Sequence, residues 1–133
     1  MIVADASVLL DLLLDRPPAQ PLKERLAGER RLHAPHLVDT EVLHALRRWV
    51  QRGHLTPGRV EAALTSLADL PLVRWDHRPL NRRVWQLRET LTAYDATYVA
   101  LTESLDATLA STDKRLRRAA ARFIPIADGE GDR

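Results

Sequence analysis

The chain has 133 residues, a formal net charge of +2, 45% hydrophobic and 29% charged residues, and no cysteine. This length predicts one domain, and the composition is typical of a folded globular protein. Without cysteine, the chain can have no disulfide scaffold, cysteine nucleophile or thiolate zinc site. No apolar run approaches the ~20 residues that cross a membrane. The first 15 residues hold three acids and no base, unlike a signal peptide, so we expect a cytoplasmic protein.

Short apolar runs alternate with longer segments of helical periodicity. In chain order, the sequence predicts a strand at 2–4, helices at 7–14 and 20–28, a strand at 31–34, helices at 38–52 and 57–68, a strand at 72–75, helices at 78–91 and 95–105, a strand at 107–110, a helix at 114–122 and a last strand at 123–126. This alternation predicts an α/β fold with a central, mainly parallel sheet of four to five strands flanked by helices. We expect a single domain over residues 1–126 and a flexible polar tail over residues 127–133.

Four acidic residues lie at one edge of this predicted sheet. Asp5 directly follows the first strand, and Asp113 follows the strand that ends near Ser111. Glu41 lies in the first turn of the helix after the second strand, and Asp95 opens a later helix. In open parallel sheets, active sites lie outside the carboxyl ends of the strands. These acids are far apart in the sequence, so only the fold could bring them together.

Each of these acids also has a structural interpretation. Asp5 could cap the helix that follows it, and Asp113 could lie in the first turn of another helix. Glu41 could favour a helix start through the dipole, with Asp39 as the cap, and residues 92–95 fit a capping box. For any one acid, this interpretation is at least as strong as a functional one. The functional interpretation therefore depends on all four acids converging.

Convergence of four carboxylates calls for a counter-cation, because nearby like charges disfavour ionisation. A hard divalent cation such as Mg²⁺ prefers oxygen ligands, and it can activate water and a phosphodiester without a side-chain nucleophile. Ser7 and Ser111 each lie two residues from an acid, where a hydroxyl could orient a metal-bound water or a carboxylate. Ordinary turn or cap bonding is the equally weighted alternative for both serines.

Four segments that contain these acids occur together, in the same order, in one known family. They begin at Asp5-Ala-Ser7, Ala34-Pro35-His36, Leu91-Thr92-Ala93 and Ser111-Thr112-Asp113. The third segment continues as the string Tyr-Asp-Ala-Thr-Tyr-Val-Ala-Leu over residues 94–101. Over about residues 1–126, the chain resembles the PIN-domain ribonucleases, and within them the VapC-like toxins of bacterial toxin–antitoxin pairs.

This resemblance implies an endoribonuclease that depends on Mg²⁺ or Mn²⁺ and hydrolyses RNA phosphodiester bonds. The residues that match the family's catalytic and metal-binding acidic quartet are Asp5, Glu41, Asp95 and Asp113. Ser7 and Ser111 match its hydroxyl positions, although the family often has threonine where Ser111 stands. Such toxins commonly form homodimers and are silenced by a cognate antitoxin, so the resemblance implies both partners in addition to RNA.

Basic residues are concentrated in segments that contain no acid. Residues 42–60 hold four arginines, and residues 114–127 hold four arginines and a lysine. Arginine suits bidentate contacts to phosphate, and basic segments around an acidic centre fit a metal site that handles a polyanion. Solvated helix faces are the alternative interpretation. The basic segments could contact RNA phosphates, and the arginines that we expect to face solvent are Arg82, Arg83, Arg115 and Arg118.

Two other classes of protein remain open. A non-catalytic PIN-like interaction module would keep the fold without needing the acids, and the complete quartet argues against it. A phospho-acceptor signalling domain normally pairs two acids after its first strand and uses a strand-end lysine, whereas Asp5 stands alone and Lys114 is predicted to be helical. A histidine metal site is disfavoured as well, because residues 41–44 form the chain's single Glu-x-x-His motif and a di-iron bundle needs two.

Overall fold

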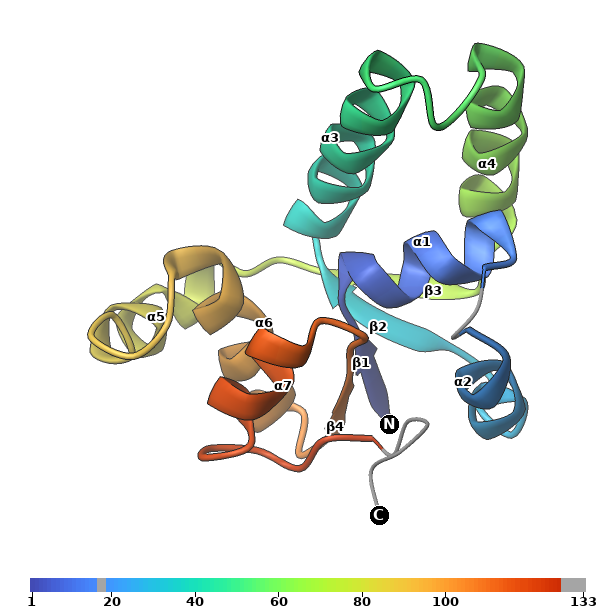
Figure 1. Ribbon diagram of the computed structural model, residues 1–133. Coiled ribbons are helices and arrows are strands. Elements are labelled where there is room, and N and C mark those ends of the chain that lie inside the picture. The colour runs from blue at the N-terminus through green and yellow to red at the C-terminus, as the bar shows by residue number, and fades with distance from the viewer. Residues whose placement is uncertain (17–18, 128–133) are drawn as a thin grey trace.

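A four-stranded parallel sheet runs through the middle of the molecule (Figure 1). The computed structural model describes residues 1–16 and 19–127. The strands, in spatial order, are β3 (Leu72–Trp75), β2 (Leu32–Pro35), β1 (Ile2–Ala4) and β4 (Thr108–Ala110). Every neighbouring pair is parallel. The predicted α/β fold with a parallel sheet is therefore confirmed.

Helices cover this sheet and extend beyond it. They are α1 (Ala6–Leu14), α2 (Ala19–Leu26), α3 (Leu37–Gln51), α4 (Pro57–Asp69), α5 (Asn81–Gln86), α6 (Ala93–Ser104) and α7 (Lys114–Ala120), with a 3-10 turn at Arg78–Leu80. In Figure 1, α3 and α4 stand above the sheet, and α6 and α7 lie to the left of β1 and β4. Both α3 and α4 pack on α1, while α6 packs against β1, β2 and β4. In the part of the chain that the structure describes, no helix is long and apolar enough to cross a membrane.

The strand β1 and the middle of helix α6 are buried without interruption. Val3 at the centre of β1 is fully buried between His33 of β2 and Leu109 of β4, the residues with which it is in register. Seven consecutive residues of α6, Ala96–Thr102, are buried, so this helix has almost no solvent-facing side along its middle. Because both elements are buried, their positions are fixed. Asp5 at the end of β1 and Asp95 at the start of α6 are therefore held in place.

Two predicted elements are wrong in form. Residues 78–91 are not one helix: after α5 the chain makes tight turns closed by hydrogen bonds such as Thr90 N–H to the Leu87 carbonyl, at 3.0 Å. Residues 123–126 form no strand, only one parallel bridge from Ile126 to Leu109. Pro125, which directly precedes Ile126, has no backbone N–H with which to extend the ladder.

The chain stays packed one residue beyond the predicted domain boundary. Ala127 is fully buried, and its N–H donates to the Leu109 carbonyl at 2.7 Å. Residues 128–133, which make up the rest of the predicted tail, lie outside the described residues.

An ion pair with a buried carboxylate lies where the end of α1 meets α3. Asp11 of α1 is only 4% exposed. Arg16 donates to its Oδ1 atom from Nε at 3.1 Å and from Nη2 at 2.6 Å. The same guanidinium lies 4.2 Å from the centre of the Trp49 ring of α3. A carboxylate buried in this way is tolerated only while its partner remains.

We predict that Arg16→Ala lowers the free energy of unfolding by about 2–3 kcal/mol, because it leaves the Asp11 carboxylate buried and unpaired. Urea unfolding measures this value. Arg78→Ala is the control, because the pair of Arg78 with Asp76 is exposed and its loss should leave the stability nearly unchanged. In the double variant Asp11→Leu/Arg16→Ala, most of the lost stability should return. Equal effects of Arg16→Ala and Arg78→Ala would contradict the prediction.

Candidate active site

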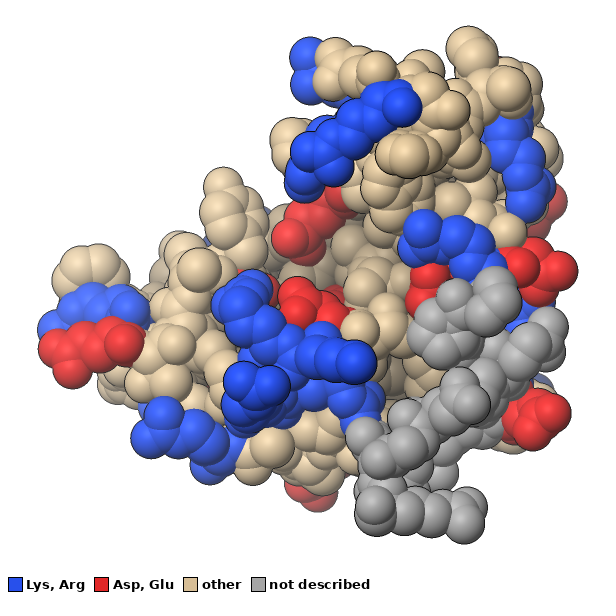
Figure 2. Space-filling view, in the orientation of Figure 1, with Lys and Arg blue, Asp and Glu red and all other residues tan. Residues whose placement is uncertain are grey.

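The carboxyl ends of β1, β2 and β4 meet at one edge of the sheet, and four acids lie there. Asp5 follows β1 and Asp113 follows β4, as predicted. Asp95 lies in the first turn of α6. Glu41 is the fifth residue of α3, one position further into the helix than predicted, because α3 begins at Leu37. Figure 2 shows a central acidic patch bordered by basic side chains over α7 and over the outer part of α3.

Asp5 is the most buried of these acids, at 5% exposure. It is the N-cap of α1: its Oδ1 accepts from the Val8 N–H at 3.2 Å and from the Ser7 hydroxyl at 2.6 Å. Its Oδ2 accepts from the Ser111 hydroxyl at 2.6 Å. Burial raises the pKa of Asp5 to about 6; the hydrogen bonds from Ser111, Ser7 and Val8 oppose this rise, and the charge of Asp113 adds to it. The capping interpretation was correct, and it leaves a carboxylate that ionises reluctantly.

Ser7 and Ser111 connect Asp5 to the turn after β4. Their hydroxyl oxygens lie 3.4 Å apart. The Ser7 hydroxyl also accepts from the Thr112 N–H at 2.9 Å, and the Ser111 hydroxyl accepts from the Asp113 N–H at 3.0 Å. The two serines thus orient a carboxylate and also stabilise a turn, which unites the two interpretations that the sequence left open.

Glu41 is half-buried and is held by a residue to which sequence analysis gave no role. The Tyr98 hydroxyl of α6 donates to Glu41 Oε1. Burial raises the pKa of Glu41; the Tyr98 hydrogen bond opposes this, and the charges of Asp5 and Asp95 add to it. Burial together with the Glu41 charge raises the pKa of Tyr98 far above its usual range. The signal for Tyr98 was its place one helical turn after Asp95, on the same helix face.

Asp95 and Asp113 share a basic neighbour. The Arg115 Nη2 atom lies 2.9 Å from Asp95 Oδ2 and 3.8 Å from Asp113 Oδ2. Asp113 is also the N-cap of α7, since its Oδ1 accepts from the N–H groups of Arg115 and Leu116 at 2.9 and 3.2 Å. Thr92 caps α6 by accepting from the Asp95 N–H at 3.2 Å, so this part of the capping box is confirmed.

Asp39 does not cap α3, contrary to the structural interpretation above. The residue at the cap position is His36, which makes no side-chain capping bond. Asp39 instead pairs with Arg74 of β3, whose Nη2 donates to its Oδ1 at 2.8 Å. Arg74 lies on strand β3, so the sequence of the helix alone could not show that it binds Asp39.

His33 accepts from the indole N–H of Trp75 at 3.1 Å, so its Nδ1 atom is already occupied.

The acids offer the oxygen donors that a hard divalent cation prefers. The charges of Asp5 and Asp95 raise the pKa of Glu41, so these carboxylates lie within electrostatic reach of one another. Among the described residues, however, no three His, Asp or Glu side chains are arranged to hold an ion. Hydrogen bonds from the serines, Tyr98 and Arg115 hold the carboxylates in their present orientations. The carboxylate oxygens are thus of the chemical kind that suits such a cation, and their present hydrogen bonds occupy them with partners from the protein.

The sequence and the fold both match a known protein family. Residues 2–122 match the PIN domain. The chain therefore belongs to the PIN-domain family. Within that family, its similarity to VapC ribonucleases extends over most of its length. Ribonuclease VapC9 of Mycobacterium tuberculosis is 42% identical over 126 residues, which are 95% of this chain and 96% of VapC9. Ribonuclease VapC12 of the same species is 39% identical over 116 residues, which are 87% of this chain and 89% of VapC12.

Two solved structures share the fold. PAE2754 from Pyrobaculum aerophilum superposes with a TM-score of 0.70 at 23% identity, covering 94% of this chain and 83% of that one. VapC20 of M. tuberculosis, described as a toxin that cleaves the sarcin–ricin loop, also has a TM-score of 0.70, at 17% identity. That match covers 96% of this chain and all of VapC20. At these identities, the likeness concerns the fold.

We predict that the metal-free protein loses stability as the pH rises from about 4 to about 6.5. The pKa of Asp5 is raised from 3.8 to about 6. The folded state therefore holds this proton more tightly than the unfolded state, and stability falls as pH passes the folded pKa. A shift of about two units corresponds to roughly 2–3 kcal/mol at neutral pH. Glu41, with its raised pKa, acts in the same direction.

Urea unfolding in EDTA across this pH range, compared with Asp5→Asn, tests that prediction. Asparagine keeps the capping oxygen but does not titrate, so stability should fall less steeply with pH in the variant. Asp69→Asn, at the exposed end of α4, is the matched control and should follow the wild type. The same slope in wild type and Asp5→Asn would show that Asp5 ionises normally.

Proposed function

We propose that this protein is an endoribonuclease toxin of the VapC type, which hydrolyses RNA phosphodiester bonds with Mg²⁺ or Mn²⁺. The observation that carries the proposal is the gathering of four acids from four separate parts of the chain at the carboxyl edge of the sheet. The residues proposed to hold the ion are Asp5, Glu41, Asp95 and Asp113. When bound, the ion supplies Lewis-acid activation of the phosphate and of the attacking water.

The surrounding residues have positioning roles in this proposal. Ser7 and Ser111 fix the Asp5 carboxylate from two sides, so its direction is set before substrate arrives. Tyr98 orients Glu41 in the same way from α6. Basic side chains over α7 and α3 border the acids and would attract the RNA backbone (Figure 2). Preorganisation of this kind reduces the reorganisation that the reaction requires.

The relatives suggest the biological setting. As in the VapC systems that the sequence resembles, we propose that a cognate antitoxin silences the enzyme, that the protein forms a homodimer and that it acts in the cytoplasm. The names of the similar proteins VapC9 and VapC12 describe ribonucleases, which supports RNA as the substrate. A non-catalytic interaction module would have no need for the buried, costly Asp5 carboxylate and its two serine donors.

We predict that Asp95→Asn keeps the fold and reduces RNA cleavage by about a hundredfold or more, since losing a ligand should cost at least as much as losing its supporting residues. The assay is cleavage of total cellular RNA by purified, antitoxin-free protein with Mg²⁺, and then with EDTA. Asp69→Asn is the matched control and should cleave like the wild type. Wild-type levels of cleavage by Asp95→Asn would exclude Asp95 from the site.

We also predict that Mg²⁺ or Mn²⁺ stabilises the folded protein, because an ion that binds only the native state shifts the unfolding equilibrium. At a metal concentration about 100 times Kd, the gain is about 3 kcal/mol. Thermal unfolding with and without metal measures it, and Asp5→Ala should abolish it. If calorimetry detects no divalent metal bound to the wild type, the interaction module becomes the better description.

A further inference from the structure

Arg115 lies between two acids of the candidate active site. Its Nη2 atom is 2.9 Å from Asp95 Oδ2 and 3.8 Å from Asp113 Oδ2, so one guanidinium faces a carboxylate from α6 and another from the start of α7. The Asp95 side chain is 14% exposed, whereas that of Arg115 is 66% exposed. The positive charge thus covers the acids from the solvent side.

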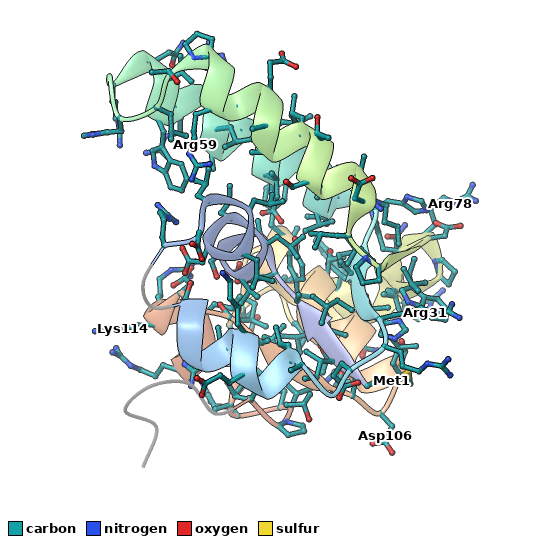
Figure 3. All side chains as sticks on the ribbon, turned by 90° about the vertical axis from the view of Figure 1, so that its right-hand side faces the viewer. Met1, Arg31, Arg59, Arg78, Asp106 and Lys114 are labelled. Atoms are coloured by element: carbon teal, nitrogen blue, oxygen red, sulfur yellow. The ribbon has the colours of Figure 1, made fainter. Side chains whose placement is uncertain are left out.

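The place of Arg115 in its own helix does not favour a positive charge. It is the second residue of α7, where the backbone N–H groups and the helix dipole favour acids. Lys114 stands just before it and, in Figure 3, points into solvent at the end of the sheet away from Met1 and Asp106. The unfavourable position of Arg115 is offset by the two carboxylates that it faces.

The contacts of Arg115 differ from those of its neighbours in α7. Arg117 donates from Nη1 to the carbonyls of Ser111 and Ala127 at 2.9 and 3.2 Å, and so ties backbone segments together. The single guanidinium hydrogen bond of Arg115 within the described chain goes to Asp95. Arg118, one turn further along, is exposed. Arg115 can therefore leave its position without breaking any backbone contact.

We propose that Arg115 is the internal counter-cation of the carboxylate site, which neutralises Asp95 and Asp113 in the metal-free protein and is displaced outward when a divalent ion binds. The inference rests on the proposed function. It describes an exchange of one cation for another: the guanidinium remains protonated throughout, because arginine does not titrate in this range. Arg115 is thus a positioning residue whose side chain reports whether the site is loaded.

Two consequences follow from this exchange. In the metal-free protein, Arg115 relieves the repulsion among the acids and holds the Asp95 carboxylate by its hydrogen bond. A divalent ion must compete with this guanidinium, so Arg115 weakens metal binding. Once displaced, the exposed guanidinium stands at the rim of the site, where an RNA phosphate can take the place of the carboxylates as its partner. Metal loading and RNA binding are thereby coupled through one side chain.

The test compares Arg115→Gln with Arg118→Gln, which removes the same charge from the same helix without removing a contact to the acids. Calorimetric titration with Mg²⁺ and with Mn²⁺ should show three- to tenfold tighter binding in Arg115→Gln, and a change below about twofold in Arg118→Gln. This range follows from the effect of a close opposite charge on a carboxylate, reduced for solvent exposure. Arg115→Lys, which keeps the charge, should bind metal within about twofold of the wild type.

A second readout uses RNA cleavage at saturating metal, where Arg115→Gln should raise KM several-fold more than it lowers kcat. Unchanged or weaker metal binding by Arg115→Gln, in a protein that the wild-type titration shows to bind metal, would overturn the inference and leave Arg115 as a clamp between α6 and α7. The proposed function would survive that result. If the wild type itself binds neither ion, the proposed function and the inference both fail. If Arg115→Gln does not fold, Arg115→Lys serves as the test variant. Metal binding by Arg115→Lys that is more than about twofold weaker than in the wild type would then overturn the proposal.

Discussion

The arrangement of the site depends on the burial of one carboxylate. Asp5 ends the central strand β1, and its oxygens are satisfied by Ser7, Val8 and Ser111. These donors come from the start of α1 and from the end of β4, so a single side chain fixes how the two elements meet. Burying an unpaired carboxylate costs several kcal/mol, whereas three hydrogen bonds make it tolerable. The hydrogen bonds do not offset the cost of burial completely, and the pKa of Asp5 therefore stays raised.

The other acids lie around Asp5 and have different partners. Glu41 is half-buried beneath the Tyr98 hydroxyl, whereas Asp95 and Asp113 face Arg115 at the solvent side. Tyr98 is buried, and its neutral hydroxyl satisfies the Glu41 carboxylate without adding charge to a buried place. The guanidinium of Arg115 is mostly exposed, so its charge stays hydrated while it contacts Asp95. The charged partner thus lies where solvent reaches it, and the neutral partner lies where solvent does not.

The sequence predicted correctly those elements and residue positions that depend on periodicity and strand order. The predictions failed where contacts between distant parts of the chain determine the local structure or a side chain's partner. Asp5 and Asp113 were placed correctly because each follows a strand of a parallel sheet. The single helix over 78–91 was wrong because tight turns bury Leu87 and Leu91 at the same spacing as a helix would. Asp39 was expected to cap α3, but it pairs instead with Arg74 of strand β3. The contact of Tyr98 with Glu41 joins residues 57 positions apart, which no local pattern records.

The low net charge of +2 hides a strong separation of charge, and that separation links the fold to its proposed chemistry. Buried carboxylates at the end of a parallel sheet repel one another, and the chain contains this repulsion with donors from α6 and α7. Basic side chains outside the acids can attract a polyanion, whereas the Asp5 carboxylate is buried. In the proposed function, the outer basic residues would set the affinity for RNA, and the acids would set the affinity for a metal. Arg115 is exposed and contacts Asp95, which is why we propose that it couples the two.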